Sequence, residues 1–332
     1  MIISRTPLRI SFAGGGTDLA AYYKRQPGAV TSTAINKYIY VTINKKFDNR
    51  IRVSYSKTEN VEHVDELHHG LVREAMKLTG LDSGVEITTI ADIPSRGTGL
   101  GSSSSLTVGL LNALYAYQGI LKSRESLAAE ACKIEIDILG EPIGKQDQYI
   151  ASYGGIQHIQ FNPDESVYVD PVICTTKTKL ALENHLLLFY TGITRKASSI
   201  LTKQIKNTKK KEDNLIKMKT LSEKVRDSIC ENKVKDVGLA LHKGWFYKKE
   251  LASGISNPVI DKYYRKALKA GALGGKILGA GGGGFLLIFC DSKYHKKVRH
   301  ALKELPMVPV KLEPQGSKII YIEDIQRDLK YL

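Results

Sequence analysis

The residue types of this chain that are best suited to bind or transform a ligand lie in glycine-rich segments. Residues 93–117 read IPSRGTGLGSSSSLTVGLLNALYAY, so Gly97, Gly99 and Gly101 precede a run of serines and an apolar helical pattern. Glycines in a tight loop let backbone N–H groups approach a ligand closely. The N-terminus of a helix adds unpaired N–H donors and a partial positive charge. Together these features predict an anion site, and phosphate is its usual occupant.

A second glycine-rich segment, RTPLRISFAGGGTDL at residues 5–19, carries charged residues on both sides of its glycines. Arg9 lies in an apolar β-like run, where an arginine usually pairs with a carboxylate or a phosphate. Asp18 follows the triple glycine. A third segment, GAGGGGF at residues 279–285, matches GxGxxG, but a strand pattern follows it where a dinucleotide site requires a helix. We therefore reject a dinucleotide site and infer that its consecutive glycines pack very close to a ligand or to another loop.

Carboxylates gather in a fourth segment, EIDILGEPIGKQDQYIASYGG at residues 135–155. Glu135 and Asp137 flank the apolar stripe of their expected helix, so either could face a site beside the core. Asp147 lies between two glutamines, after a turn rich in glycine and proline. The chain contains no GxxxxGK[ST] loop and neither HRD nor DFG, so its sequence excludes a P-loop and a protein-kinase site.

The elements that must position these residues are a mixture of strands and helices. Alternating patterns predict strands and turns in the first 60 residues, and residues 84–92 predict a strand that leads into the glycine loop. Ser123 is a suitable N-cap for one continuous helix whose stripe is Leu127, Ala131, Ile134 and Ile138. Helices are expected over residues 65–79, 103–117, 123–139, 197–252, 257–271 and 292–304. The chain is therefore α+β, and we divide it into domains at residues 1–170 and 171–332.

Composition is that of an ordinary globular protein with a marked positive charge. The chain has 332 residues, 42% of them apolar, and a formal net charge of +15. It shows no apolar run of about 18 residues and no signal-peptide pattern, and its four cysteines are widely spaced. We expect a cytoplasmic protein without membrane contact. Much of the excess charge lies in residues 203–219, which lack aromatic residues, so we interpret them as a solvated helix face and expect no nucleic-acid partner.

In their order along the chain, these segments resemble the motifs of the GHMP kinases, the superfamily of galactokinase, homoserine kinase, mevalonate kinase and phosphomevalonate kinase. RTPLRISFAGGGTDL resembles the first motif, PSRGTGLGSSSS the second and KILGAGGGGFLLIF the third. FAGGGTDL together with GKQDQYIASYGG is most similar to the sugar-1-kinase branch that contains D-glycero-D-manno-heptose 7-phosphate kinases, with L-fucose kinase domains as close relatives. The resemblance implies a two-domain GHMP kinase fold, with an ATP-binding N-terminal domain like domain 2 of ribosomal protein S5 and a ferredoxin-like C-terminal domain.

The same resemblance implies roles for individual residues. Asp147 matches the catalytic aspartate, and Arg9 matches a basic residue that would keep it ionised and stabilise charge on the γ-phosphate. Ser103 and Glu135 match the residues that hold Mg²⁺, although hydroxyls at 104 and 105, where the motif has alanine, leave open which serine meets the metal. The ATP phosphates would lie on Gly97, Gly99, Leu100, Gly101, Ser102, Ser103 and Ser104. The sugar would be bound by Gly15, Gly16, Thr17, Asp18, Gly281, Gly282 and Gly283.

The implied function is ATP-dependent phosphorylation of the anomeric hydroxyl of a phosphorylated sugar. For D-glycero-D-manno-heptose 7-phosphate the product is the 1,7-bisphosphate, for nucleotide-heptose and surface-polysaccharide synthesis. From charge and position, Arg195 and Lys196 are candidates to bind the sugar's phosphate. The expected partners are ATP with Mg²⁺, the sugar phosphate and a second copy of the chain in a homodimer. Three alternatives stay open: a kinase of a free sugar such as L-fucose, a sensor that binds ATP and sugar without turnover, and a nucleic-acid binder that uses the basic helix.

Overall fold

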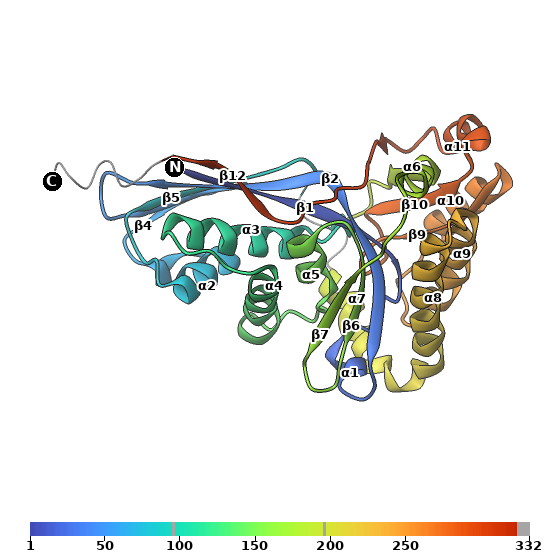
Figure 1. Ribbon diagram of the computed structural model, residues 1–332, viewed down its shortest axis with the longest axis horizontal. Coiled ribbons are helices and arrows are strands. Elements are labelled where there is room, and N and C mark those ends of the chain that lie inside the picture. The colour runs from blue at the N-terminus through green and yellow to red at the C-terminus, as the bar shows by residue number, and fades with distance from the viewer. Residues whose placement is uncertain (95–96, 195–196, 324–332) are drawn as a thin grey trace.

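The computed structural model describes residues 1–94, 97–194 and 197–323, and it has a long sheet at one end and a smaller one at the other (Figure 1). Described strands of the long sheet run in the order β12–β1–β2–β5–β3–β4, and β6 and β7 extend it from the first half of β2. Their bounds are β1 (Ile2–Ala13), β2 (Gly28–Lys45), β3 (Ile51–Ser54), β4 (Thr58–Val61), β5 (Val85–Ala91), β6 (Ile156–Phe161), β7 (Val167–Pro171) and β12 (Lys318–Ile322).

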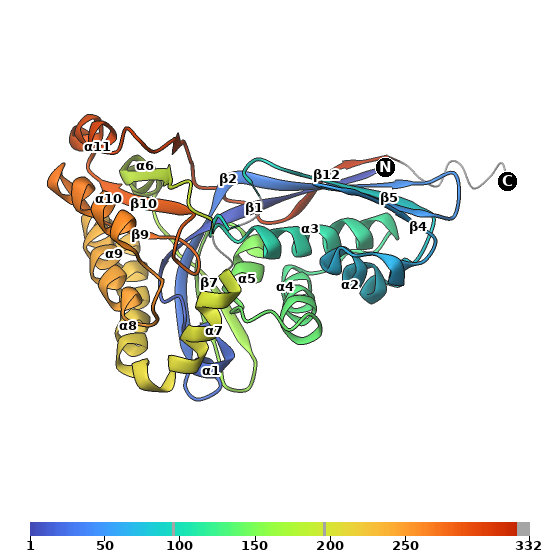
Figure 2. The ribbon, with the colours of Figure 1, turned by 180° about the vertical axis from the view of Figure 1, so that it is seen from behind.

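Helices from the first half of the chain cover one face of this sheet, as Figures 1 and 2 show from opposite sides. They are α2 (Gly70–Thr79), α3 (Ser102–Tyr117), α4 (Arg124–Cys132) and α5 (Gln146–Tyr153), with short turns at α1 (Ala20–Tyr23) and η1 (Val64–Glu66). The helix predicted from residue 65 therefore begins only at Gly70. Helix α3 lies close against β1, because Ser4 Oγ donates to the carbonyl oxygen of Gly109 at 2.8 Å. This contact fixes the helix whose N-terminus follows the glycine loop.

The second sheet is antiparallel and has the strand order β11–β8–β10–β9. Its strands are β8 (Leu186–Tyr190), β9 (Ala272–Ile277), β10 (Phe285–Cys290) and β11 (Met307–Val308). Helices connect β8 to β9 and β10 to β11, which is the βαββαβ connectivity of ferredoxin-like folds. The helices of this half are α6 (Thr176–His185), α7 (Ala197–Asn207), η3 (Lys209–Lys211), α8 (Glu212–Cys230), α9 (Val234–Lys249), α10 (Pro258–Lys269), η4 (Ser292–Tyr294) and α11 (His295–Ala301). The expected α+β, two-domain fold is confirmed.

The two halves share a core and contact each other at several places, including α8 and β12. Buried residues of α8 belong to the same apolar cluster as β1 and β2, and Ser222 Oγ of α8 donates to the carbonyl oxygen of Ala29 at 3.1 Å. At the end of the chain, β12 returns to pair with β1. The predicted boundary at 170/171 falls inside β7, just before its last residue Pro171, and the range 171–332 also contains β12 of the first sheet. The division by two continuous ranges is therefore wrong for β12.

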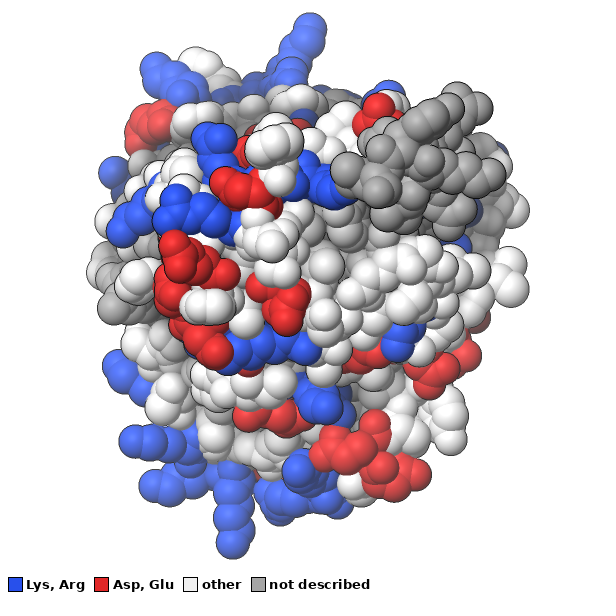
Figure 3. Space-filling model, turned by 90° about the vertical axis from the view of Figure 1, so that its left-hand side faces the viewer, with Lys and Arg blue, Asp and Glu red and all other residues white. Residues whose placement is uncertain are grey.

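The basic run spans the end of α7, η3 and the start of α8. Lys203, Lys206 and Lys209 are exposed, whereas Leu215 and Met218 point into the core, so the run is a solvated helix face as predicted. At the end of the molecule that faces left in Figure 1, basic and acidic side chains are interspersed (Figure 3). Within the described residues, no helix combines the length and apolar character needed to cross a membrane.

Candidate active site

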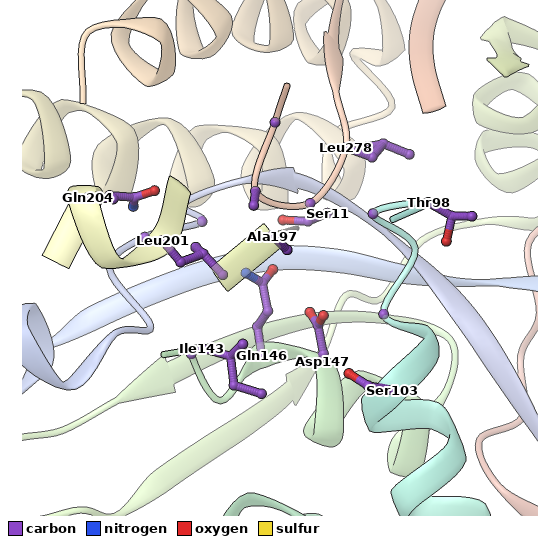
Figure 4. Close-up of a pocket in the computed structure, with 18 of the residues that line it drawn as sticks. Ser11, Thr98, Ser103, Ile143, Gln146, Asp147, Ala197, Leu201, Gln204 and Leu278 are labelled. Carbon is purple, nitrogen blue, oxygen red and sulfur yellow. The ribbon is translucent and has the colours of Figure 1, made fainter. Parts of the chain in front are cut away.

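A cavity of about 660 Å³ lies between the two halves and collects most of the residues expected to do chemistry. Its lining comes from β1 and the loop after it, the loop before α3, the start of α5, helix α7, and the loop between β9 and β10. In Figure 4, Gln146 and Asp147 of α5 and Ser103 of α3 point into the same space, with α7 along another side. Segments separated by more than a hundred residues therefore meet at one site.

Arg9 and Asp147 form a two-pronged ion pair at this site. Arg9 Nε donates to Asp147 Oδ1 at 2.8 Å, and Arg9 Nη2 donates to Asp147 Oδ2 at 2.6 Å. Only 4% of Arg9 is exposed, so its predicted pairing with an anion is confirmed and the anion is a carboxylate of the protein. Such parallel hydrogen bonds fix both the position and the orientation of the carboxylate. Asp147 lines the cavity and is held ready to contact a ligand there.

The glycine loop before α3 is held from both sides by backbone contacts. Gly97, Gly99 and Gly101 have φ angles of +70°, +75° and +77°, which favour glycine. A Cβ on Gly99 would lie 2.4 Å from the carbonyl oxygen of Leu278, so the loop between β9 and β10 packs directly on it. On the other side, Arg9 donates its backbone N–H to the carbonyl of Leu100 at 3.0 Å and Nη1 to that of Gly99 at 2.6 Å. The third glycine segment was expected to pack against a ligand or against another loop, and the glycine loop before α3 is such a loop.

The serines that follow the loop do not share one environment. Ser102 and Ser103 line the cavity, and Ser103 is exposed. Ser104 and Ser105 are buried, and Ser105 Oγ donates to the carbonyl oxygen of Pro7 at 2.8 Å. Ser103 thus presents its hydroxyl to the cavity (Figure 4), which leaves it as the better-placed candidate to meet a metal.

Glu135 does not line the cavity but is buried beside the serines at the start of α3, in a part of its helix that is not regular. The predicted continuous helix over 123–139 ends as an α-helix at Cys132, and a π-helical segment follows at Lys133–Ile138. The wider turn bonds the N–H of Leu139 to the carbonyl of Ile134 at 3.0 Å. The wider turn changes which side chains point into the protein. Glu135 is 1% exposed, whereas Ile138, which was expected in the apolar stripe, is 45% exposed. Asp137 is exposed, so the structure decides between the two acids.

Glu135 has surroundings that suit a divalent cation. Burial raises its pKa to about 7, although hydrogen bonds with Ser104, Gln148 and Ser103 act in the opposite direction. Gln148 Nε2 donates to Glu135 Oε2 at 2.6 Å, and Gln148 Oε1 is buried without a partner among the described residues. Carboxylate, hydroxyl and amide oxygens are the ligand types that Mg²⁺ prefers. In the described part of the chain no three His, Cys, Asp or Glu side chains cluster as a metal site.

The loop after β1 contributes one charged side chain to the cavity. Gly15, Gly16 and Asp18 line it. Asp18 Oδ1 accepts from the N–H of Gly16 at 2.7 Å and Oδ2 accepts from Gln146 Nε2 at 3.0 Å, and burial raises the pKa of this carboxyl. Thr17 is fully buried, and its hydroxyl donates to the carbonyls of Gly14 and Ala29. The expectation that Thr17 contacts a ligand is therefore wrong, because its hydroxyl is used to hold the loop.

The third glycine segment is only partly turned toward the cavity. Gly281 and Gly283 line it, whereas Gly282 donates its N–H to the carbonyl of Ile255 at 2.8 Å. Arg195 and Lys196 lie outside the described residues. Their roles, like the other ligand contacts expected from the sequence, stay predictions.

Sequence reasoning missed two buried lysines that line the cavity. Lys248 of α9 is 7% exposed and Lys276 of β9 is 6% exposed. Burial lowers the pKa of Lys248 to about 7 and that of Lys276 well below its usual value. A signal existed for Lys248, because it continues the stripe Val234, Val237, Leu241 and Trp245 at helical spacing, and each of these is buried. Lys276 likewise stands in an otherwise small and apolar strand.

A second cavity of about 330 Å³ adjoins the start of the glycine loop. It lies between the β3–β4 turn, the end of β5 and α3. Its lining is Ile39, Tyr55, Ser56, His69, Thr89, Ile90, Ala91, Ile93, Pro94 and Leu106. Leu106 follows Ser102 by one helical turn, so this cavity and the larger one flank the same N-terminal turn of α3.

Comparison with known proteins finds kin over nearly the whole chain. Family models match for the GHMP kinases N terminal domain at residues 66–155 and the GHMP kinases C terminal at residues 225–306. D-glycero-alpha-D-manno-heptose 7-phosphate kinase of Campylobacter jejuni subsp. jejuni serotype O:2 is 30% identical to this chain, and the match covers 91% of this chain and 94% of that protein. The bifunctional fucokinase/GDP-fucose pyrophosphorylase of Arabidopsis thaliana is 27% identical to this chain, and the match covers 92% of this chain and 31% of that longer protein. A crystal structure of a D-glycero-D-manno-heptose 1-phosphate kinase from Bacteroides thetaiotaomicron superimposes on this chain with a TM-score of 0.81. The match covers 98% of this chain and 100% of that chain at 24% identity, which shows a shared fold.

Proposed function

This chain belongs to the GHMP kinase family, and from that premise we propose that it transfers the γ-phosphoryl group of ATP to the anomeric hydroxyl of D-glycero-D-manno-heptose 7-phosphate. The observation that carries the proposal is the two-pronged Arg9–Asp147 pair beside the glycine loop. Phosphoryl transfer depends on positioning and charge neutralisation more than on covalent help from the protein. A fixed carboxylate next to a loop of backbone donors supports this chemistry.

ATP is assigned to the two cavities that flank the start of α3. Backbone N–H groups of residues 97–103 and the positive end of α3 would bind its phosphates. The adenine would lie in the smaller cavity, whose apolar and aromatic lining includes Tyr55, Ile90 and Leu106. The base and the phosphates would then lie on either side of the same helical turn.

Mg²⁺ is assigned to Ser103 and Glu135, whose oxygen atoms fit its preferences. When bound, the ion neutralises charge on the β- and γ-phosphates. Glu135 would be ionised in that state, because a neighbouring cation favours the charged form of a buried carboxyl. Gln148 would hold Glu135 in place through the hydrogen bond between Nε2 and Oε2.

Asp147 would accept the proton of the attacking hydroxyl, with Arg9 holding its carboxylate in position. An anomeric hydroxyl is more acidic than other sugar hydroxyls, so a carboxylate is an adequate base. Asp18, which keeps its position through Gly16 and Gln146, would accept hydrogen bonds from other hydroxyls of the sugar. Gly281 and Gly283, which line the cavity, would contact the opposite side of the sugar.

The choice of a phosphorylated heptose is supported by the name of the relative that is 30% identical over most of both chains. The relative named a fucokinase favours a second candidate, phosphorylation of free L-fucose by the same residues. We further propose that Arg195 binds the sugar's phosphate, so that R195A would raise KM for the heptose phosphate but not for ATP.

A kinetic comparison tests the proposal. Turnover would be measured with ATP, Mg²⁺ and heptose 7-phosphate, mannose 6-phosphate, sedoheptulose 7-phosphate, mannose or L-fucose, with D147N as the matched variant. We expect the highest kcat/KM for the heptose phosphate and a loss of about 10²–10⁴-fold in kcat for D147N, the range of general-base contributions. A preference for L-fucose would change the proposed substrate but leave the proposed mechanism unchanged. Full activity in D147N would contradict the assignment of the base.

A further inference from the structure

We propose that Lys248 is a catalytic residue outside the glycine-rich motifs, whose ammonium group binds a non-bridging oxygen of the γ-phosphoryl group of ATP and follows it during transfer. The inference rests on the proposed kinase function. It assigns a ligand to a charged side chain that comes from the second domain, although the phosphate-binding loop belongs to the first.

The geometry of Lys248 leaves one hydrogen-bond donor for a ligand. Its Nζ donates to the carbonyl oxygen of Ile277 at 3.3 Å and also to that of Gly279. A lysine ammonium has three N–H donors, so the third remains for the cavity that Lys248 lines. No carboxylate forms an ion pair with it in the described parts of the chain. A buried charge without a counter-charge is unfavourable, and a bound anion would relieve that cost.

A short series of contacts connects Lys248 to the catalytic pair. Lys248 binds Gly279, and a Cβ on Gly279 would lie only 2.5 Å from Cα of Gly99. Gly99 in turn accepts a hydrogen bond from Arg9 Nη1, and Arg9 holds Asp147. The charges of Arg9, Asp18 and Asp147 all act on the Lys248 ammonium. Lys248 and Arg9 are therefore held on opposite sides of the contact between the two glycine loops, where the phosphates are assigned.

The balance of charge in the cavity also calls for an anion. Arg9 is already neutralised by Asp147. Lys276 is a second buried lysine, and its Nζ donates to the carbonyls of Ser11 and Phe12 at 2.9 and 3.2 Å, so these contacts already use its side chain. Asp18 is then the remaining acid among the groups that act on both lysines. Because burial also raises the pKa of Asp18, a protonated Lys248 lacks a strong counter-charge, which a bound phosphoryl group would supply.

In the transfer step, the bond between the γ-phosphorus and the bridging oxygen of ATP breaks, and its electron pair leaves on the β-phosphate of ADP. A bond forms between the γ-phosphorus and the sugar oxygen, whose proton passes to Asp147. Lys248 exchanges no proton. It donates a hydrogen bond to an oxygen that stays on phosphorus throughout, where fixed positive charge stabilises the spread of negative charge.

Nucleotide binding without sugar tests the proposal independently of turnover. Titration calorimetry with Mg²⁺ would compare the Kd of ADP with that of AMPPNP, a non-hydrolysable ATP analogue, in wild type, K248M and K249M. Lys249 is the matched control, because it is the adjacent lysine and pairs with Asp261 at 3.4 Å instead. We expect wild type and K249M to prefer AMPPNP and K248M to lose about tenfold or more of that preference, as expected for a charged hydrogen bond. An unchanged preference in K248M would overturn the proposal.

Two further readouts separate a ligand contact from a clamp on the loop. K248M should reduce kcat by about 10²–10³-fold on any sugar that wild type phosphorylates, while ADP still binds. Equal weakening of ADP and AMPPNP would instead identify a purely structural role and refute the assignment. If K248M does not fold, K248R decides, because it keeps the charge: a retained AMPPNP preference supports the proposal and its loss opposes it. Absence of turnover by wild type on every sugar, with the AMPPNP preference intact, would count against the proposed sugar reaction and not against Lys248.

Discussion

The contact between the two glycine loops leads to a prediction that a matched pair of variants can test. Gly99 and Gly119 precede and follow the same helix, α3, and both have φ of +75°. A Cβ on Gly119 would meet nothing within 4 Å, whereas a Cβ on Gly99 would lie 2.4 Å from the oxygen and 2.7 Å from the carbon of the Leu278 carbonyl. G119A therefore measures the cost of the backbone angle alone, and G99A adds the collision between loops.

The magnitudes follow from these distances. Alanine in the left-handed region costs about 1–2 kcal/mol at either position. The atoms that meet the new Cβ of G99A belong to backbone, so the loops must separate, and overpacking of this kind costs about 1–3 kcal/mol more. Because Gly99 O accepts a hydrogen bond from Arg9 Nη1, separation also moves the residue that holds Asp147. A misplacement of about 1 Å can reduce a rate about 100-fold.

The assays are urea unfolding and initial rates with ATP and the best sugar. G119A should lose only the smaller free energy of unfolding and keep wild-type kcat. G99A should unfold at lower urea and lose about 100-fold in kcat. If G99A matched G119A in both stability and rate, the loops would not be in rigid contact, and the argument that their packing aligns Arg9 would be refuted.

Three further predictions concern residues around the site and the core. E135Q should raise the Mg²⁺ concentration for half-maximal rate about 10–100-fold, measured by metal titration; an unchanged requirement would remove Glu135 from the metal site. T17V should lose about 1–3 kcal/mol of unfolding free energy with KM for the sugar unchanged, and the reverse pattern would show that the hydroxyl contacts substrate. Burial lowers the pKa of His158, which contacts Thr31, to about 4. Its charged neighbours are Arg226, Lys219, Asp170 and Asp227. Between about pH 6.5 and about pH 4 this histidine is therefore protonated in the unfolded chain but neutral in the folded chain. Wild type should therefore lose about 3 kcal/mol as pH falls from about 6.5 to about 4, and H158Q, followed by urea unfolding at both pH values, should lack that part of the decline.

The sequence predicted the parts of the site whose chemistry is local. Glycines at 97, 99 and 101 indicate positive φ and close backbone approach, and an arginine in an apolar strand needs an anion, so both features can be recognised from the residues themselves. The expectation for Arg9 is confirmed by its pair with Asp147, which lies 138 residues away. The two-domain α+β fold was likewise predictable, because strand and helix periodicities are properties of short windows.

Other features depend on contacts or helix geometry that no short window contains. The π-helical turn after Cys132 places Glu135 inward and Ile138 outward, against the regular stripe. The return of β12 to β1 joins the two ends of the chain and leaves no local pattern. Lys248 lies on the buried face of α9, but a lysine on an apolar stripe more often marks the edge of that stripe, since its long side chain can reach solvent. Only the tertiary structure shows that it is covered and aimed at the cavity.

In the proposed reaction, Asp147 directs ATP's phosphoryl group to the anomeric oxygen of a phosphorylated heptose. The most direct measurement is ³¹P NMR of the product formed from ATP, Mg²⁺ and D-glycero-D-manno-heptose 7-phosphate by wild type and by D147N. We expect a second phosphate resonance coupled to the anomeric proton in the wild-type reaction and almost none with D147N in the same time. A phosphate on a different hydroxyl, or equal product from both proteins, would contradict it.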